Sequence, residues 1–203
     1  MIVLDIETSG LTGREGIWQI GAINLKDTRK YFLQEGKIDD EDNIQPQALR
    51  VTGKTEKELR DPKKQSQKQL ILNYLDWVKE QKERIFFGEN PGFDAMMIQD
   101  KAYKYSIDNA FRKIHGHRTM DIHTLAQRKY KEIHGIYLLE DGKDSMNLSA
   151  VLKFCGLPDE RINLRGDEVV KNGKAHNALE DCKLEGEACW RLEEGKNLFQ
   201  EYA

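Results

Sequence analysis

The chain opens on Ile2-Val3-Leu4-Asp5-Ile6-Glu7-Thr8-Ser9, a run in which apolar residues lead directly into acidic ones. Side chains alternate along a strand, so Val3, Asp5 and Glu7 point to one face and the residues between them to the other. Apolar residues on both faces are typical of a strand buried in the middle of a sheet. Two carboxylates on one face repel each other unless a cation lies nearby. We therefore expect a central strand over residues 1–7 that carries an acidic pair.

Apolar runs with strand or helix periodicity follow along the rest of the chain. Further strands are predicted over 17–25, 29–34, 84–88 and 118–121, and helices over 46–52, 66–78, 91–105, 122–130, 148–155 and 178–192. Together they predict an α/β fold in which helices flank a five-stranded mixed sheet. A chain of 203 residues is close to the size of one ordinary domain, about 100–200 residues, so residues 1–203 are expected to form a single domain.

The composition excludes several classes of protein. Hydrophobic residues make up 38% of the chain and recur periodically, which argues against disorder. No apolar stretch approaches the roughly 18–20 residues of a membrane span. The N-terminus reaches an acidic residue at position 5 without a basic region, so no signal peptide is expected. The cysteines, at 155, 182 and 189, form no C-x-x-C pair, which indicates a reduced, cytoplasmic location.

The charge of the chain is unevenly distributed. A formal net charge of −3 argues against a protein that coats nucleic acid, but not against a nuclease. Between residues 101 and 131, eight lysines and arginines stand against two acidic residues. This stretch is either a solvated surface or a flank that contacts phosphates.

A second acidic position lies in Asn90-Pro91-Gly92-Phe93-Asp94. Asn90 is a good helix N-cap, Pro91 suits the first helical position, and Asp94 then falls in the first turn. Asp94 could simply complement the helix dipole. The alternative is a site, because the helix follows a predicted parallel strand, and ligands gather at the C-terminal ends of such strands.

A third position lies in His176-Asn177-Ala178-Leu179-Glu180-Asp181. Asn177 and Glu180 have the spacing of a capping box, which places His176 just before the helix and Asp181 in its first turn. That spacing brings an imidazole beside a carboxylate. The alternative is a surface histidine ahead of an ordinary capped helix. The other four histidines lack the spacing of metal ligands and are expected at the surface or in caps.

The three acidic positions gain meaning when they are taken together. Hard oxygen ligands such as Asp5, Glu7, Asp94 and Asp181 suit Mg²⁺ or Mn²⁺. Two such ions can clamp the attacking and leaving oxygens of a phosphodiester displacement. His176 could accept a proton from the attacking water near neutral pH.

Four segments of the chain resemble the DEDDh family of 3′→5′ exonucleases, the DnaQ-like branch of the ribonuclease H-like fold. They are Leu4–Leu11, Ala48–Thr55, Asn90–Asp94 and His176-x4-Asp181. The resemblance implies that Asp5, Glu7, Asp94 and Asp181 are metal ligands for two divalent cations and that His176 is the general base. Since Asn177 stands where the sister subclass has tyrosine, the histidine subclass is indicated.

The resemblance also implies an activity and a substrate. A member of this family removes nucleotides one at a time from the 3′ end of single-stranded DNA or RNA and releases nucleoside 5′-monophosphates. The turn after Glu7 then lies against the terminal nucleotide. Thr8 and Ser9 are the resulting candidates for substrate contacts, with Asn90 and Phe93 as supporting residues.

Two features depart from the family pattern. Many relatives carry histidine before the Asn of the second motif, where this chain has Glu89. The segment 161–174 is long and charged, and its Arg165, Lys171 and Lys174 could touch phosphates or belong to a mobile loop.

Two other interpretations stay open at this point. Asp5-Ile6-Glu7-Thr8 faintly resembles the start of haloacid-dehalogenase phosphatases, with Asp5 as nucleophile. That family needs aspartate where Glu7 stands, and it gives no role to Asp94 or His176. The other interpretation is a non-catalytic module that binds nucleic acid or a protein partner.

Overall fold

A computed structural model describes residues 1–165 and 168–202 of the chain. Its centre is a five-stranded sheet with the order β3-β2-β1-β4-β5. The strands are β1 (Ile2–Thr8), β2 (Ile17–Asn24), β3 (Tyr31–Glu35), β4 (Phe86–Gly88) and β5 (Thr119–Asp121). The first three pair antiparallel, whereas β4 and β5 run parallel to β1. The predicted mixed sheet is confirmed, with β3 and β4 each beginning two residues later than expected.

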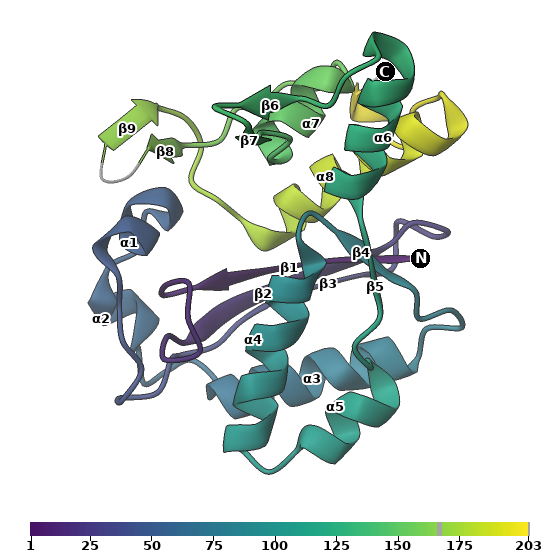
Figure 1. Cartoon of the computed structure of the whole chain (residues 1–203). Coiled ribbons are helices and arrows are strands. Elements are labelled where there is room, and N and C mark those ends of the chain that lie inside the picture. The colour runs from purple at the N-terminus through teal and green to yellow at the C-terminus, as the bar shows by residue number, and fades with distance from the viewer. Residues whose placement is uncertain (166–167, 203) are drawn as a thin grey trace.

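Helices cover both faces of the sheet (Figure 1). On one face lie α3 (Gln67–Lys79), α4 (Pro91–Lys104) and α5 (Asp108–Ile114); on the other lie α6 (Ile122–His134), α7 (Leu148–Phe154) and α8 (Ala178–Glu194). The short helices α1 (Pro46–Thr52) and α2 (Glu56–Leu59) lie beyond the end of β1. None of the described helices is long and apolar enough to cross a membrane.

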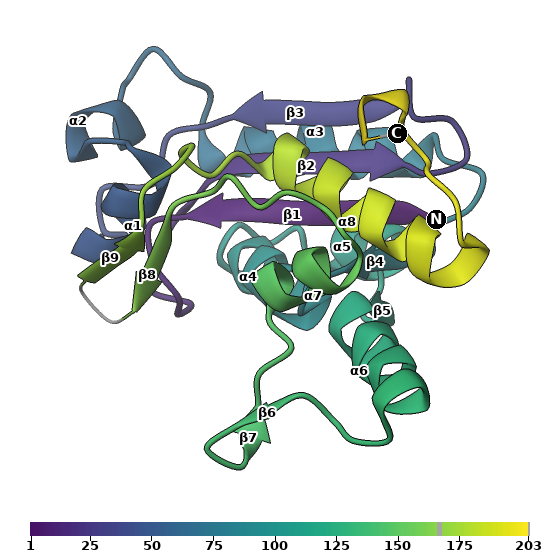
Figure 2. The same ribbon diagram turned by 90° about the horizontal axis from the view of Figure 1, so that it is seen from above.

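Two short hairpins and one 3-10 turn complete the described part of the chain. Figure 2 shows the hairpin of β6 (Leu139–Glu140) and β7 (Lys143–Asp144) projecting from the body of the molecule. A second hairpin is made by β8 (Asn163–Arg165) and β9 (Glu168–Lys171), and a 3-10 turn, η1, covers Gln200–Tyr202. The segment 161–174 contains a pair of antiparallel strands, where the sequence predicted a long, charged stretch that touches phosphates or forms a mobile loop. The side chain of Arg165 lies outside the described residues.

The alternation of β1 divides the core into two apolar clusters. Ile2, Leu4 and Ile6 pack with residues of α3, α4 and α5. Val3 packs with residues of α6, α7 and α8 on the opposite face. Asp5 and Glu7 share the parity of Val3, so the acidic pair lies on the face that α8 covers.

A glycine in β2 lets α8 lie unusually close to the sheet. Gly21 pairs with Asp5 across the β1–β2 ladder. A Cβ atom at Gly21 would lie 2.4 Å from the carbonyl carbon of Ala178, the first residue of α8. The backbone N–H of Ala178 also donates to Gln19 Oε1, at 2.9 Å. Since only glycine leaves room for this contact, Gly21 sets how near the start of α8 comes to Asp5.

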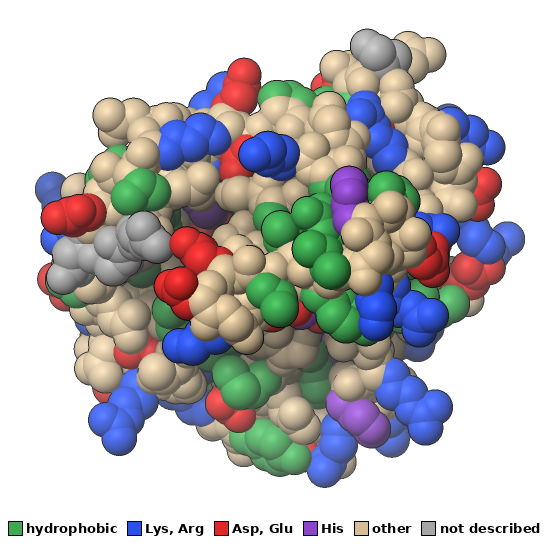
Figure 3. Space-filling view, turned by 45° about the horizontal axis from the view of Figure 1, so that its top comes forward, with side chains coloured by type: hydrophobic (Ala, Val, Ile, Leu, Met, Phe, Trp, Pro, Cys, Tyr) green, Lys and Arg blue, Asp and Glu red, His purple; other side chains and the backbone are tan. Residues whose placement is uncertain are grey.

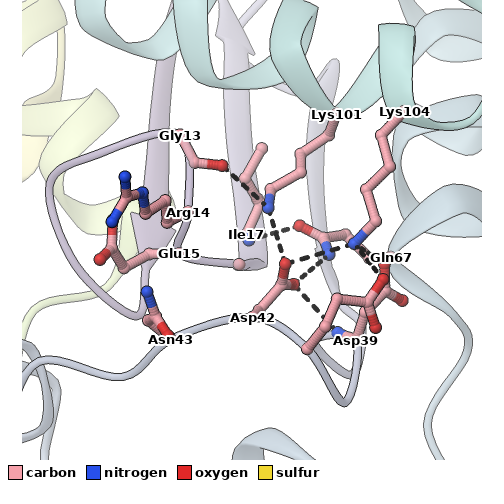
Figure 4. Close-up of polar contacts among 12 residues, drawn as sticks. Gly13, Arg14, Glu15, Ile17, Asp39, Asp42, Asn43, Gln67, Lys101 and Lys104 are labelled. Atoms are coloured by element: carbon pink, nitrogen blue, oxygen red, sulfur yellow. Dashed lines mark hydrogen bonds and ion pairs between the residues drawn. The ribbon is translucent and has the colours of Figure 1, made fainter.

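A buried ion pair joins α4 to the loops around the end of β1 (Figure 4). Lys101 Nζ lies 2.8 Å from Asp42 Oδ1, and both side chains are 3% exposed. Gln67 donates to the other oxygen of Asp42 at 2.8 Å and accepts from the backbone N–H of Ile17 at 2.6 Å. Lys104 pairs with Asp39 at 2.6 Å. The two predicted roles of the basic stretch, solvated surface or phosphate contact, are therefore both wrong for Lys101, which is a structural cation.

His115 occupies the C-cap of α5, one of the two kinds of position predicted for it, but its side chain is not at the surface. His115 is buried, and its ring stacks on Phe86 with the ring centroids 3.6 Å apart. Burial lowers the pKa of His115 to about 4, so the ring is neutral in the folded protein. A lone histidine ahead of a turn gives no sequence signal that distinguishes this core position from a surface one.

Candidate active site

The acidic pair lies at the end of β1. Glu7 is buried and Asp5 is half-buried. The β1–β2 register shifts between Glu7 and Thr8, an irregularity of the kind that re-aims side chains beside functional sites. Burial, together with the negative charge of Asp181, raises the pKa of both Asp5 and Glu7 well above its usual range.

Asp94 reaches this strand end from α4, on the other face of the sheet. It is buried, and its Oδ1 accepts a hydrogen bond of 3.0 Å from the backbone N–H of Ile6, the residue between Asp5 and Glu7. Burial raises the pKa of Asp94 to about 7, although the hydrogen bond from Ile6 opposes that shift. A surface carboxylate that merely complements the helix dipole would be exposed, so this alternative for Asp94 does not fit the structure.

Asn90 stands at the N-cap position of α4 but does not cap it. Its backbone is left-handed, with φ 50°, and its side chain makes no cap hydrogen bond. The predicted capping role of Asn90 is therefore wrong, whereas Pro91 does occupy the start of the helix as predicted. The backbone N–H of Asn90 donates to Asp121 Oδ1 at 3.4 Å, which ties this turn to the end of β5.

The third position brings an imidazole beside a carboxylate. Asn177 caps α8 by accepting hydrogen bonds from the N–H groups of Leu179 and Glu180, but Glu180 pairs with Lys183, so only half of the predicted capping box forms. His176 Nδ1 lies 3.5 Å from Oδ2 of Asp181.

Both ends of His176 are also held by backbone groups. Its Nε2 lies 2.8 Å from the carbonyl oxygen of Ile162, to which only a protonated Nε2 can donate. Its backbone N–H donates to the carbonyl of Val51 at 2.9 Å, which joins α1 to the start of α8. The ring therefore presents Nδ1 toward the carboxylates.

The structure brings the three acidic positions to one edge of the sheet. Single ligand atoms from Glu7, His176 and Asp181 lie within 4.8 Å of one another. Burial raises the pKa of Asp181, against the opposing charges of Arg161 and His176. Glu7 Oε1 is buried and has no hydrogen-bond partner in the described structure. A concentration of buried carboxylates this high is costly unless cations compensate for it.

Two residues of this region were not found from the sequence. Arg161 is 8% exposed, and its guanidinium lies 3.6 Å from Asp181 and 3.0 Å from Asp159. No motif marks Arg161, because its contact with Asp181 depends on the path of the chain before β8. Glu185 is 2% exposed and follows Asp181 by one helical turn, so the i, i+4 spacing was an available signal.

A cavity of about 690 Å³ opens beside these carboxylates. Its walls are mostly apolar and come from the end of β1, the turn after it, α1, α4 and β8: Ile6, Glu7, Thr8, Gly10, Leu11, Gln45, Gln47, Ala48, Val51, Thr52, Phe93, Leu164 and His176. Only two of the four residues predicted to contact the substrate line this cavity. Thr8 and Phe93 line the cavity, whereas Ser9 and Asn90 do not.

Ser9 has a different place from the one predicted. Its side chain is completely buried. Its hydroxyl donates to the carbonyl of Asn43 at 2.6 Å and accepts from the N–H of Gly16 at 2.9 Å. Ser9 therefore holds the turn in shape, and we do not retain it as a substrate contact.

The charged residues that depart from the family pattern are largely paired. Lys171 donates to the carbonyl of Asp159, and Lys174 forms an ion pair with Glu160. Glu89 is half-buried, and burial and the charge of Asp121 raise its pKa.

Figure 3 shows lysines and arginines spread around the rim of one face rather than gathered in a single patch.

This arrangement agrees with a family comparison. The model of the RNase T family, described as "Exonuclease", matches residues 2–187. The chain belongs to this exonuclease family. Its fold is the predicted DnaQ-like, ribonuclease H-like fold. Because this is a family of nucleases, the interpretation as a phosphatase, in which Asp5 is the nucleophile, is not retained. A search of curated proteins finds no match.

Solved structures show the same fold in larger proteins. Product-bound exonuclease I is similar with a TM-score of 0.69 and 20% identity, over 96% of this chain and 43% of that one. E. coli exonuclease I in complex with a dT13 oligonucleotide has a TM-score of 0.69 and 21% identity, over 94% of this chain and 40% of that one. Cell-death related nuclease 4 has a TM-score of 0.68 and 14% identity, over 97% of this chain and 64% of that one. This chain therefore spans less than half the length of the exonuclease I chains.

Proposed function

We propose that this chain is a metal-dependent 3′→5′ exonuclease that shortens single-stranded nucleic acid and releases nucleoside 5′-monophosphates. The observation that carries the proposal is the convergence of three distant segments. Asp94 bonds to the backbone between Asp5 and Glu7, and Asp181 lies beside His176 within reach of Glu7. As one exonuclease domain with free cysteines, residues 1–203 would act in the cytoplasm.

The residues at this edge fit a pair of Mg²⁺ or Mn²⁺ ions. Asp5, Glu7, Asp94 and Asp181 offer the hard oxygen donors that these ions prefer. The unpartnered Oε1 of Glu7 and the raised pKa values of the carboxylates are what a metal-free site of this kind would show. When bound, the cations would neutralise the phosphodiester and stabilise its attacking and leaving oxygens.

His176 is the proposed general base. The Ile162 carbonyl holds the proton on Nε2, so Nδ1 keeps the lone pair that can accept a proton from water. Asp181 faces Nδ1 at 3.5 Å and would stabilise the imidazolium that forms. The Val51 carbonyl holds the backbone of His176, so this residue is anchored at its backbone as well as at its ring.

The apolar cavity beside the carboxylates is the proposed place of the terminal nucleotide. Phe93 and Leu164 offer apolar surface for a base, and Thr8 lies in the same wall. Contacts of this kind accept any base of a single strand, because every base has an apolar face. The dT13 oligonucleotide in the E. coli exonuclease I structure supports this choice of substrate class.

The test uses 3′- and 5′-labelled DNA and RNA, single- and double-stranded, with Mg²⁺, Mn²⁺ or EDTA. We expect 5′-labelled single strands to shorten stepwise, 3′-labelled strands to release a labelled mononucleotide at once, and EDTA to stop both. Asp181→Asn is the matched inactive control. Release of the 5′ label as mononucleotide before the strand has shortened, or cleavage in EDTA, would contradict the proposal, and binding without cleavage would indicate a non-catalytic module.

A further inference from the structure

Glu185 is a fifth carboxylate beside the candidate active site, and the proposed mechanism does not use it. It lies on α8, one turn after Asp181 and on the same side of the helix. Its side chain is 2% exposed. Both Asp94 and Asp181 raise its pKa, in addition to the larger effect of burial, so it lies within the field of the acidic cluster.

One oxygen of Glu185 is buried without any partner. Oε2 makes no hydrogen bond in the described structure. If Oε2 carried the proton of a neutral carboxyl it would need an acceptor, and in every other state it would need a donor or a cation. A buried polar atom left without a partner costs about 1–3 kcal/mol, and more when its group is charged, so an unpartnered Oε2 at this position calls for a ligand.

Oε2 lies close to the ends of the elements that carry the metal ligands. Oε2 lies 3.2 Å from the position that a Cβ atom would take at Gly88, the last residue of β4. The same position is 3.1 Å from the carbonyl oxygen of Leu4, which precedes Asp5, and 3.4 Å from Pro91 at the start of α4. Because Gly88 has no side chain, the carboxylate is not shielded from the junction of β1, β4 and α4.

The geometry points to Glu185 as a fifth carboxylate of the metal centre, which strengthens the binding of a hydrated divalent cation. This inference rests on the proposed function. Mg²⁺ retains several water molecules when proteins bind it, and such waters need acceptors beyond the direct ligands. A partner of this kind changes metal affinity by about 10–100-fold when it is removed.

The test is Mn²⁺ binding to the metal-free full chain, measured by calorimetry, with the melting temperature in EDTA measured alongside. Glu185→Gln keeps the size of the side chain and removes its charge. Glu194→Gln removes one charge from the exposed end of the same helix and is the matched control. We expect Glu185→Gln to weaken Mn²⁺ binding about tenfold or more, with a melting temperature in EDTA that is equal to or above that of the control.

The other outcomes separate the two proposals. Wild-type affinity in Glu185→Gln would overturn the role of Glu185 and leave the proposed function intact. Weaker binding together with a lower melting temperature in EDTA than the control would assign Glu185 a structural role and overturn the inference. A wild-type chain that binds no Mn²⁺ would overturn both the inference and the proposed metal centre.

Discussion

His176 has two ring nitrogens with different tasks. Nε2 is tied to the Ile162 carbonyl, and Nδ1 faces Asp181, so one nitrogen is fixed as a donor and the other is free to accept a proton. This asymmetry comes from a single backbone carbonyl outside the three sequence motifs. It makes the role of the histidine separable from that of the carboxylates.

We predict that His176→Ala lowers kcat by about 10²–10⁴ while Mn²⁺ affinity stays within about twofold of the wild type. The physical reason is that the imidazole is assigned proton transfer and not metal binding. Single-turnover cleavage of a labelled oligonucleotide and calorimetry measure the two effects. A large loss of metal affinity would instead make His176 a ligand, which its distance from Glu7 and Asp181 also permits.

At the scale of the elements, the site depends on how closely α8 lies on the sheet. Asp5 and Asp181 belong to different elements, and Gly21 sets the approach of those elements. The contact at Gly21 is with backbone atoms of Ala178, which cannot rotate away as a flexible side chain would. Any side chain at this position must move the start of α8.

We predict that Gly21→Val lowers both activity and Mn²⁺ affinity by more than about tenfold, because displacement of α8 separates Asp181 from Asp5. Cleavage assays and calorimetry on the folded variant measure this. Gly92→Ala is the control, since a Cβ at Gly92 would meet no atom within 4 Å. Equal metal affinity in Gly21→Val and the wild type would show that the close approach is not required.

The helix α4 is held at two points, Asp94 near its start and Lys101 two turns later. Lys101 pairs with Asp42 and also donates to the Gly13 carbonyl at 3.4 Å, so it joins the helix to the loop after β1. We predict that Lys101→Met lowers the free energy of unfolding by up to about 3–5 kcal/mol, because the buried Asp42 loses its buried cation and keeps only the more exposed Lys104, at 3.3 Å.

Urea unfolding measures the effect of Lys101→Met. Lys104→Met is the comparison, because the Lys104 side chain is 30% exposed and an exposed pair contributes about 1 kcal/mol or less. Equal losses in the two variants would contradict the assignment of Lys101 as a structural cation.

For the whole molecule, the acidic centre links stability to pH and to metal. The pKa of Asp94 is raised to about 7 in the folded protein, above its value in the unfolded chain. A raised carboxyl pKa means that the folded state binds more protons, so stability is lost as pH rises through about 7. The lowered pKa of His115 makes stability increase with pH, which is the opposite effect. This increase lies between the folded pKa of about 4 and the ordinary value of 6.5, so it lies below the pKa of about 7 of Asp94.

We predict that the melting temperature in EDTA falls between about pH 6 and 7.5 and that Mg²⁺ at saturating concentration reduces the fall, since cations replace the missing protons. In EDTA, the melting temperature of Asp94→Asn should depend less on pH than that of the wild type. The difference between the two curves gives the contribution of Asp94 alone. A wild-type melting temperature that rises over this range in EDTA, with an equal rise in Asp94→Asn, would contradict the prediction.

The sequence by itself determined the order of the main strands and helices and the identity of the acidic positions. Local rules suffice for these: alternation in β1, the proline that begins α4, and the spacing that places His176 beside Asp181. These are interactions between residues near each other in the chain. Their geometry follows from backbone periodicity alone.

Only the tertiary structure decided which side chains share an environment across the sheet. Ser9 turned inward to bond the carbonyl of Asn43, 34 positions away, and Lys101 was buried against a carboxylate that lies 59 positions away in the chain. Arg161 and Glu185 joined the acidic centre through the path of the chain and the close packing at Gly21. Burial and electrostatic fields depend on distance in space, so no local pattern could specify Ser9, Lys101 or Arg161, and the i, i+4 spacing gave Glu185 its side of the helix but not its burial.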